Sequence, residues 1–388
     1  MTNNKKKIVI IGPAYPYRGG NSLYVSSVYT ILKDYFDVSV VNFSLLYPSI
    51  LFPGTSQQDI SEKQIYQIPS ERIINSINPF TWFKAAKHIK SLKPDIVIFD
   101  WWNPFFGPAL FSISKLIKRE LKNKIIFITE NVISHEGKFL DRILTKIGLK
   151  NASSFIVLSD VVEKDIVEYS KGRSVYKSAL PVYDCYMLNK IPDLLKIKNQ
   201  LGFDADDTII LFFGYVRKYK GLNILIDAMK DITSFDKKIK LLIVGEFYDS
   251  PDKYYSQIKK LNLGDNIKVV QKFVPNEDVG NYYSIADIVV LPYLNATQSG
   301  VLNIAYGFRK PVVVTDVGGL SEDVVEGKTG YVVKPGRPEF IAEGIFKFMK
   351  NRSETEFEKY IEEKLSENEF NKMPQLVGRI IEDLSNAN

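Results

Sequence analysis

The strongest constraint on the fold is a rhythm of short β-branched runs that alternate with longer amphipathic runs, stop, and then start again. The first series of strand candidates comprises Lys7–Ile11, Val38–Val41, Asp95–Phe99, Lys124–Thr129 and Ser154–Leu158. The second series comprises Thr208–Phe213, Lys240–Val244, Ile267–Val270, Asp287–Leu291 and Pro311–Thr315. Strands that alternate with helical stretches are typical of βαβ units on a parallel sheet. The pattern therefore predicts an α/β chain with two doubly wound domains.

The break between the two series indicates the domain boundary. A chain of 388 residues exceeds the usual size of a single hydrophobic core. The strand pattern stops in "PVYDCYMLNKIPDLLKIKNQLGFDADD", where polar and turn-forming residues gather. We expect an N-terminal domain over 1–183, a linker over 184–204, a C-terminal domain over 205–354 and a helical tail over 355–388 that packs back on the N-terminal domain. The carboxyl ends of both sheets would then line an interdomain cleft, where such folds bind ligands.

Composition narrows the class of protein. The single cysteine, Cys185, excludes an internal disulfide and a cysteine-based metal cluster. No run approaches the roughly 18 apolar residues of a membrane span, and "MTNNKKKIVIIG" leads directly into a strand, so we expect a cytoplasmic protein.

Charge is distributed unevenly along the chain. Residues 1–185 contain 24 Lys+Arg and 16 Asp+Glu, a net of +8, whereas residues 186–388 contain 27 and 29, a net of −2. A basic half suggests an anionic partner such as the inner face of a membrane, and a lysine-rich solvated face is the alternative. We expect no nucleic-acid partner.

The first strand leads into a glycine pair. In "IGPAYPYRGGNSLYVSSVY", Gly19 and Gly20 precede a helix for which Asn21 or Ser22 is the expected N-cap. Glycines let backbone amides approach an anion, and a helix N-terminus adds partial positive charge. A tight strand-to-helix turn without a ligand is the alternative. The GxGxxG dinucleotide fingerprint is absent, which disfavours a nicotinamide enzyme.

The second series opens with a basic loop. In "LFFGYVRKYKGLNILIDAMK", Gly214 ends a strand, and Arg217, Lys218 and Lys220 precede a helix. Such cations neutralise a diphosphate, Arg through paired hydrogen bonds and Lys as a point charge. An ordinary basic surface loop is the alternative.

Five motifs in a fixed order carry a resemblance to a known family. They are "FFGYVRKYKGL", "LLIVGE", "FVPNEDVGNYYSIADIVVLPY", "SGV…AYGFRKPVVVTDVGG" and "GKTGYVVKPG". Over about residues 205–350 the chain resembles the donor half of retaining GT-B glycosyltransferases, the family 4 or group 1 glycosyl transferases. The resemblance implies transfer of a sugar, with retention, from a nucleoside diphosphate sugar to a glycan or lipid-linked acceptor. It implies no cofactor besides the nucleotide sugar.

The resemblance assigns donor-binding roles to several residues. Arg217 and Lys220 map onto the family's diphosphate-binding cations, although Tyr215 stands where many members carry an arginine directly after the glycine. Lys272 and Phe273 map near the nucleobase, and a core role for Phe273 is the alternative.

The family's paired glutamates are missing from "NATQSGVLNIAYGFRKP", where Ala296 and Ile304 take their places. An alignment shifted by one residue gives Thr297 and Ala305, or Asn295 and Asn303, and restores no carboxylate pair. Gln298 and Ser299 still offer hydrogen bonds to hydroxyl groups. The amides of Ser299, Gly300 and Val301 stand where a helix begins and are suited to a β-phosphate. The "TQSG" loop resembles a variant in relatives of the family, so we expect a subtype of donor site rather than a lost one.

Two motifs in the N-terminal half supply candidates for handling the sugar or the acceptor. In "PDIVIFDWWNPFFGPALF", Asp100 stands where many relatives carry a histidine, and Trp101 and Trp102 beside it suit stacking on an acceptor sugar or plugging a core. In "FITENVISHEGKF", Glu130 and His135 are titratable groups at a strand end. We expect Asp100, Glu130 and His135 to act at the cleft, with a surface or capping role as the alternative for His135.

Metal and membrane signals are weaker. The acids of "FDADDTII" precede a strand and are typical of a turn, so we expect no metal site. The segments "NPFTWFKAAKHIKSLKP" and "PFFGPALFSISKLIKRELKNK" suit either peripheral contact with an anionic bilayer or packing on the sheet. Two other functions stay open: a sugar-nucleotide epimerase of the same fold, and a non-catalytic sugar-nucleotide-binding protein.

Overall fold

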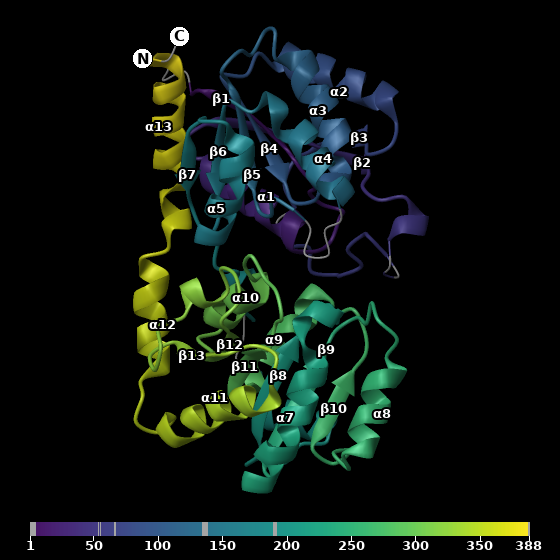
Figure 1. Ribbon diagram of the computed structural model, residues 1–388, viewed down its shortest axis with the longest axis vertical. Helices are drawn as coiled ribbons and strands as arrows, with labels where there is room; N and C mark the ends of the chain where they lie inside the picture. Colours follow the sequence, from purple (N-terminus) through teal and green to yellow (C-terminus); the bar gives the residue numbers. More distant parts are fainter. Residues whose placement is uncertain are drawn as a thin grey trace. The chain divides into compact units, whose positions relative to one another are not determined.

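The computed structural model describes residues 5–52, 54, 56–65, 67–133, 139–188 and 192–386. The chain divides into two compact units (Figure 1). Unit 1 comprises residues 1–59, 66–181 and 368–388, and unit 2 comprises residues 60–65 and 182–367.

Unit 1 is built on a parallel sheet of seven strands in the order β3-β2-β1-β4-β5-β6-β7. The strands are β1 (Lys7–Ile11), β2 (Asp37–Leu45), β3 (Glu71–Asn75), β4 (Ile96–Trp101), β5 (Ile125–Thr129), β6 (Ser154–Val157) and β7 (Val175–Lys177). The helices are α1 (Gly20–Leu32), α2 (Pro79–Leu92), α3 (Gly107–Ile117), α4 (Phe139–Gly148), α5 (Asp160–Ser170) and α13 (Met373–Asn386). The strand order reverses between β1 and β4, and such a switch point is where doubly wound sheets bind ligands.

Helices cover both faces of this sheet, which explains why its central strands are apolar throughout. Ile8 and Ile10 of β1 belong to a core cluster with residues of α1 and α13, whereas Val9 and Ile11 belong to a cluster with residues of α2, α3 and α5. Successive side chains of a strand point to opposite faces, so each face receives half of an apolar run.

Unit 2 repeats the arrangement with a parallel sheet of six strands in the order β10-β9-β8-β11-β12-β13. The strands are β8 (Thr208–Phe213), β9 (Ile239–Val244), β10 (Ile267–Val270), β11 (Ile288–Leu291), β12 (Val312–Thr315) and β13 (Gly330–Val333). The helices are α6 (Leu194–Leu201), α7 (Leu222–Phe235), α8 (Asp252–Lys260), α9 (Asn276–Ile285), α10 (Gly300–Gly307), α11 (Pro338–Asn351) and α12 (Phe357–Ser366). Its switch point lies between β8 and β11.

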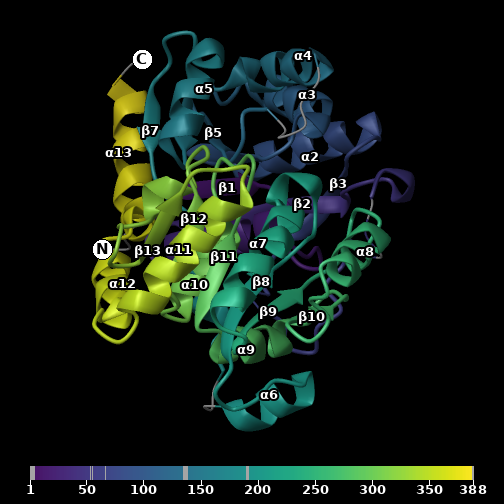
Figure 2. The same cartoon turned by 60° about the horizontal axis from the view of Figure 1, so that its bottom comes forward.

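The segments expected to form a linker and a tail are divided between the two units in another way than expected. The range 184–204 belongs to unit 2 and contains a short 3-10 helix, Asp184–Tyr186, and α6. The expected tail is shared: α12 belongs to unit 2, and α13 belongs to unit 1. There Asp383 accepts a 2.7 Å hydrogen bond from the Tyr176 hydroxyl, and both views show α13 alongside β7 (Figures 1 and 2).

Residues 60–65 belong to unit 2 although they lie within the connection between β2 and β3 of unit 1. The Glu277 carboxylate accepts hydrogen bonds from the backbone N–H groups of Glu62 and Lys63, each 3.2 Å long. The Asn276 N–H donates to the Ser61 hydroxyl at 2.9 Å. These bonds occupy the N-terminal end of α9, where a helix leaves backbone donors without internal partners. The sequence pattern did not predict this crossing of the chain.

In the part of the chain that the structure describes, no helix has the length and apolar character needed to cross a membrane.

Candidate functional site

The candidate donor site in unit 2 lies at the carboxyl ends of β8 and β11, next to the switch point. β8 runs into Gly214, whose φ of 101° favours glycine. A side chain at Gly221 would place its Cβ 2.0 Å from the Pro292 carbonyl oxygen, so the basic loop packs closely on the chain that leaves β11. The Leu294 N–H donates a 2.6 Å hydrogen bond to the Tyr219 carbonyl and holds the loop there.

Lys220 ends the 3-10 turn of this loop and is buried, with 7% of its surface exposed. Its ammonium group lies 5.2 Å from the centre of the Tyr293 ring. Burial lowers the pKa of Lys220, the nearby Tyr219 hydroxyl opposes part of this shift, and the Arg217 charge adds to it. No carboxylate among the described residues raises this pKa. Burial also raises the pKa of Tyr293 to about 12, so this ring is neutral near pH 7. A buried cation without a counter-charge is costly and indicates a site for an anion.

The start of α10 lies beside this cation. A Cβ built on Gly214 would lie 3.3 Å from Lys220 Nζ and 3.4 Å from Val301 Cγ2, so the ammonium group and the first turn of α10 flank the same point. Ser299 is the N-cap residue, and its side chain makes no capping hydrogen bond. The Leu302 N–H donates to the Ser299 carbonyl at 3.1 Å, which leaves the N–H groups of Gly300 and Val301 at the open end of the helix. The arrangement combines a positive charge with a helix N-terminus.

The loop before α10 carries a glutamine and small residues, but no glutamate. Gln298 Oε1 is buried and has no hydrogen-bond partner among the described residues. The two glutamate positions of the family fall on residues that pack inside unit 2, because Ala296 is 2% and Ile304 8% exposed. A Cβ on Gly318 would lie 1.6 Å from the Ala296 carbonyl oxygen, so the backbone here is tightly packed.

Arg217 is half-buried on the same loop, and its guanidinium carbon lies 4.8 Å from the centre of the Tyr248 ring. Tyr215, which stands where many family members carry an arginine, packs against the same ring with 4.8 Å between centroids. The arrangement brings Arg217 close enough to Lys220 to affect its pKa.

Lys272 and Phe273 follow β10, the edge strand separated from β8 by β9. Lys272 is exposed, and its ammonium group lies 3.7 Å from the Asp278 carboxylate. Phe273 is half-buried. Both residues lie at the same carboxyl edge of the sheet as Gly214.

Unit 1 brings two carboxyl groups together at its own switch point. Asp100 is in β4, and Glu130 directly follows the neighbouring strand β5. They are 2% and 7% exposed. Asn21 of α1 donates a 2.8 Å hydrogen bond from Nδ2 to Glu130 Oε2. A Cβ on Gly12, at the end of β1, would lie 3.0 Å from the Asp100 Cβ, so glycine leaves the room that this carboxyl group occupies.

Burial favours the protonated forms of both acids of this pair. Burial raises the pKa of Glu130 to about 7, and the Asn21 hydrogen bond opposes part of that rise. Burial and the nearby Glu130 charge raise the pKa of Asp100 well above its usual range. Among the described residues, both Asp100 oxygens and Glu130 Oε1 have no hydrogen-bond partner. Two buried carboxyl groups of this kind can hold one proton between them and can bind a hydroxyl group.

The two tryptophans next to Asp100 do not form a stacking surface, which corrects the expectation that they bind an acceptor. Trp101 is completely buried, and a Cβ on Gly148 would lie 2.3 Å from its ring. Trp102 is 7% exposed, packs on Phe106 with 4.2 Å between centroids, and donates from Nε1 to the Tyr47 hydroxyl at 3.2 Å. Both belong to the core of unit 1.

The glycine loop also differs from the expected capping. Gly19, with φ of 104°, is the N-cap of α1, and Gly20 is the first helical residue. Asn21 does not cap the helix, because its side chain bonds to Glu130 instead. Gly19 and Gly20 are both exposed, and a Cβ on Gly20 would have no atom within 4 Å. His135 lies outside the described residues.

Gly12 and Tyr293 were not predicted from the sequence as site residues. Asn21 was expected to cap α1, but it binds Glu130 instead. Gly12 and Tyr293 each follow the end of a central strand, in "IVIIGP" and "VVLPY", which is the position where ligand-binding residues gather in such sheets. The pairing of Asn21 with Glu130 spans 109 positions, and no local pattern signals it.

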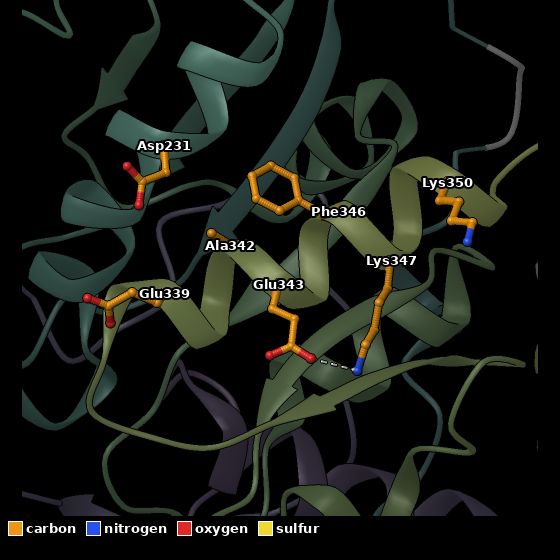
Figure 3. A pocket seen from close by; sticks show the side chains of 7 residues that line it. All are labelled: Asp231, Glu339, Ala342, Glu343, Phe346, Lys347 and Lys350. Carbon is orange, nitrogen blue, oxygen red and sulfur yellow. Dashed lines mark ion pairs between the residues drawn. The ribbon is translucent and has the colours of Figure 1, made fainter.

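A hollow of about 430 Å³ lies elsewhere on unit 2, over α7 and α11 (Figure 3). Its apolar floor is formed by Ala342 and Phe346, and the Glu343–Lys347 ion pair, 3.1 Å long, lies at its rim. None of the candidate donor residues lines it. Among the described residues, no group of three or more His, Cys, Asp or Glu side chains is placed to hold a metal ion.

Comparison with known proteins shows the family to which the chain is related. Residues 194–367 match the family model described as glycosyl transferases group 1. The chain is 31% identical over 323 residues to an uncharacterized glycosyltransferase of Methanocaldococcus jannaschii, and the match covers 76% of this chain and 80% of that protein. It is 28% identical over 191 residues to the D-inositol 3-phosphate glycosyltransferase of Corynebacterium aurimucosum, where the match covers 47% of this chain and 45% of the relative. The chain thus spans about half the length of this second relative.

Among solved structures, HepE of Anabaena in complex with UDP superposes with a TM-score of 0.74 at 17% identity, covering 97% of this chain and all of that one. The likeness shows the shared GT-B fold of two doubly wound units. The fold, the family model and the relative that is 31% identical agree: the chain is a member of the glycosyl transferases group 1 family.

Proposed function

We propose that the chain transfers a sugar from a nucleoside diphosphate sugar to a hydroxyl group of a glycan or lipid-linked acceptor, with retention at the anomeric carbon. The observation that carries this proposal is the buried Lys220 ammonium group beside the open N-terminal end of α10. A diphosphate supplies the missing negative charge and accepts hydrogen bonds from both groups. Because the HepE structure contains UDP, a uridine nucleotide is the first donor to test.

The proposed donor site divides the nucleotide sugar among several groups. Lys220, Arg217 and the amides of Ser299, Gly300 and Val301 hold the diphosphate. The buried Gln298 Oε1 accepts a hydrogen bond from a sugar hydroxyl. Lys272 and Phe273 lie toward the base. In this proposal no metal ion or further cofactor is needed, because cations and helix amides already neutralise the leaving charge.

The reaction moves one glycosyl group. The bond between the anomeric carbon and the β-phosphate oxygen breaks, and its electron pair leaves with the nucleoside diphosphate. The acceptor oxygen forms the new bond on the same face of the sugar, and its proton passes to the departing phosphate oxygen. Asp100 and Glu130 position a hydroxyl of the sugar or acceptor, because a carboxyl pair with one proton both donates and accepts hydrogen bonds.

A donor panel tests the proposal. The purified full-length chain is incubated with UDP-, GDP- and ADP-sugars, with and without simple glycan acceptors, and the products are followed by NMR. We expect one donor class to give slow hydrolysis or a glycoside with the donor's anomeric configuration. A change of stereochemistry within the sugar nucleotide would instead indicate an epimerase, and tight binding without turnover would indicate a non-catalytic binder.

A further inference from the structure

The fully buried residues of α4 are small, and four of its five large apolar side chains are exposed. Thr145 and Gly148 are its buried residues, and the Thr145 hydroxyl donates a 3.0 Å hydrogen bond to the Val132 carbonyl. Gly148 lies against the Trp101 ring, and a Cβ on Gly107 of α3 would lie 2.8 Å from the Leu144 carbonyl oxygen. The backbones of α3 and α4 therefore meet closely at Gly107 and Leu144.

The outer face of α4 carries a stripe of four apolar residues. Their exposed fractions are 79% for Phe139, 60% for Leu140, 40% for Ile143 and 39% for Ile147. At 3.6 residues per turn these positions fall within an arc of roughly 100°, opposite Thr145 and Gly148. A contiguous apolar stripe on a helix surface marks an interaction site, whereas single exposed apolar residues are ordinary.

Basic residues border this stripe. Arg142 and Lys146 are exposed and one helical turn apart, so they lie in a row along one side of it. The acidic residue of α4, Asp141, is on the opposite side of the helix. The charge of the surrounding sequence has the same sign, because residues 1–185 carry 24 basic and 16 acidic side chains.

The neighbouring helices α2 and α3 bury more of their residues than α4 does. α3, part of a segment expected to suit a bilayer, buries its apolar face through residues such as Leu110 and Ile113. α2, from the other such segment, buries Ala85 and Ile89 but exposes Phe80 by 85% and Phe83 by 60%. Figures 1 and 2 show α2, α3 and α4 side by side, with α3 in contact with both of the others.

We infer that the outer face of α4, formed by Phe139, Leu140, Ile143 and Ile147 with Arg142 and Lys146, is a docking surface for an anionic lipid membrane. An apolar stripe with a cationic border is the pattern of a helix that lies in the lipid interface. Lysine and arginine side chains are attracted to an anionic surface, and burial of apolar side chains in the interface is favourable. The charges select an anionic surface, and the apolar side chains hold the helix in it.

Vesicle sedimentation of the full-length chain tests this inference without any donor, so its outcome is independent of the proposed sugar transfer. We expect binding to vesicles of equal parts phosphatidylglycerol and phosphatidylcholine, at least tenfold weaker binding to phosphatidylcholine alone, and weakening by salt. The apolar variant Leu140→Ser with Ile143→Ser and the charge variant Arg142→Glu with Lys146→Glu should each lose at least tenfold in partitioning.

Matched controls lie on unit 2. Phe235→Ser removes a side chain that is 66% exposed, and Lys259→Glu with Lys260→Glu reverses two exposed charges on α8. Equal losses in the controls, or no binding by the wild-type chain, would overturn the inference. So would a wild-type dimer that the α4 variants convert to monomer, because the stripe would then face a second copy. Hydrogen exchange of the wild-type chain tests the inference without any substitution. Anionic vesicles should slow the exchange of the backbone amides of Phe139–Gly148, and unchanged exchange there counts against the inference.

Discussion

The ammonium group of Lys220 lies 5.2 Å from the centre of the Tyr293 ring, in a place where no carboxylate of the described residues offsets its charge. A neutral aromatic ring attracts a cation, but a contribution of about 1–2 kcal/mol does not repay the desolvation of a buried ammonium group. The fold therefore maintains a charged group that the folded chain alone does not satisfy. In the function proposed above, the diphosphate of the donor supplies the missing negative charge.

Lys220→Met should raise the stability of the ligand-free chain. Methionine keeps the length and apolar stem of lysine and removes the uncompensated charge, so we expect a gain of about 1–3 kcal/mol in the free energy of unfolding. Chemical denaturation measures it. The exposed Lys218, two residues away, provides the control, because Lys218→Met should change stability by less than about 0.5 kcal/mol. A clear loss of stability in Lys220→Met would show that the ammonium group is satisfied within the fold.

The "TQSG" loop should respond to substitution differently from the buried helix positions behind it. Gln298→Leu removes the buried carboxamide oxygen, and we expect the affinity for the intact sugar nucleotide to fall about tenfold while the affinity for UDP changes little. Ile304→Glu places a carboxyl group at a position that is 8% exposed, so it should lower stability by 2 kcal/mol or more without improving turnover. Improved turnover in Ile304→Glu would show that the missing glutamate limits this chain.

The carboxyl pair of unit 1 should make stability depend on pH. Burial raises the pKa of Glu130 from 4.5 to about 7, so the folded chain holds a proton that the unfolded chain releases. This contribution is fully present below about pH 4.5 and is lost as the pH rises through about 7. We expect Glu130→Gln to remove a pH-dependent difference on the order of 3 kcal/mol between these limits. Denaturation of both proteins across this range measures it, and parallel curves would contradict the assignment.

Chelation tests the proposed absence of a metal requirement. If Lys220, Arg217 and the helix amides neutralise the leaving diphosphate, EDTA at millimolar concentration should leave the rate of donor turnover within about twofold. The assay uses the donor identified from the panel, with magnesium added back as the control. A large loss with EDTA that magnesium restores would require a metal ion at the diphosphate.

Much of the fold was predictable because the central strands of both sheets are short runs of buried β-branched residues. The strands that the pattern missed are β3, β7 and β13. β3 and β7 are the edges of their sheet, and among their eight residues only Ile74 is buried, so they carry neither a continuous nor an alternating apolar signal. β13 is also an edge strand and has four residues between turns.

The candidate site was only partly predictable. Strand ends indicate where ligands bind, and together with the family resemblance they made Lys220, Asp100 and Glu130 candidates from the sequence. The surroundings of these side chains could not be predicted. The burial of Lys220 and its approach to α10 depend on contacts between segments about 80 residues apart. For the tryptophans next to Asp100 the sequence suggested a binding role that the structure does not show. Aromatic residues beside a carboxyl group have the same sequence pattern whether they bind a sugar or fill a core.

The most direct test of the account compares the affinities of UDP and uridine for the wild-type chain and for Lys220→Met by calorimetric titration. The account predicts that wild type binds UDP about 10–100-fold more tightly than uridine, and that Lys220→Met loses most of this difference while its affinity for uridine stays the same. The same preference for UDP in both proteins would contradict it, because the diphosphate would then lie away from Lys220 and the start of α10.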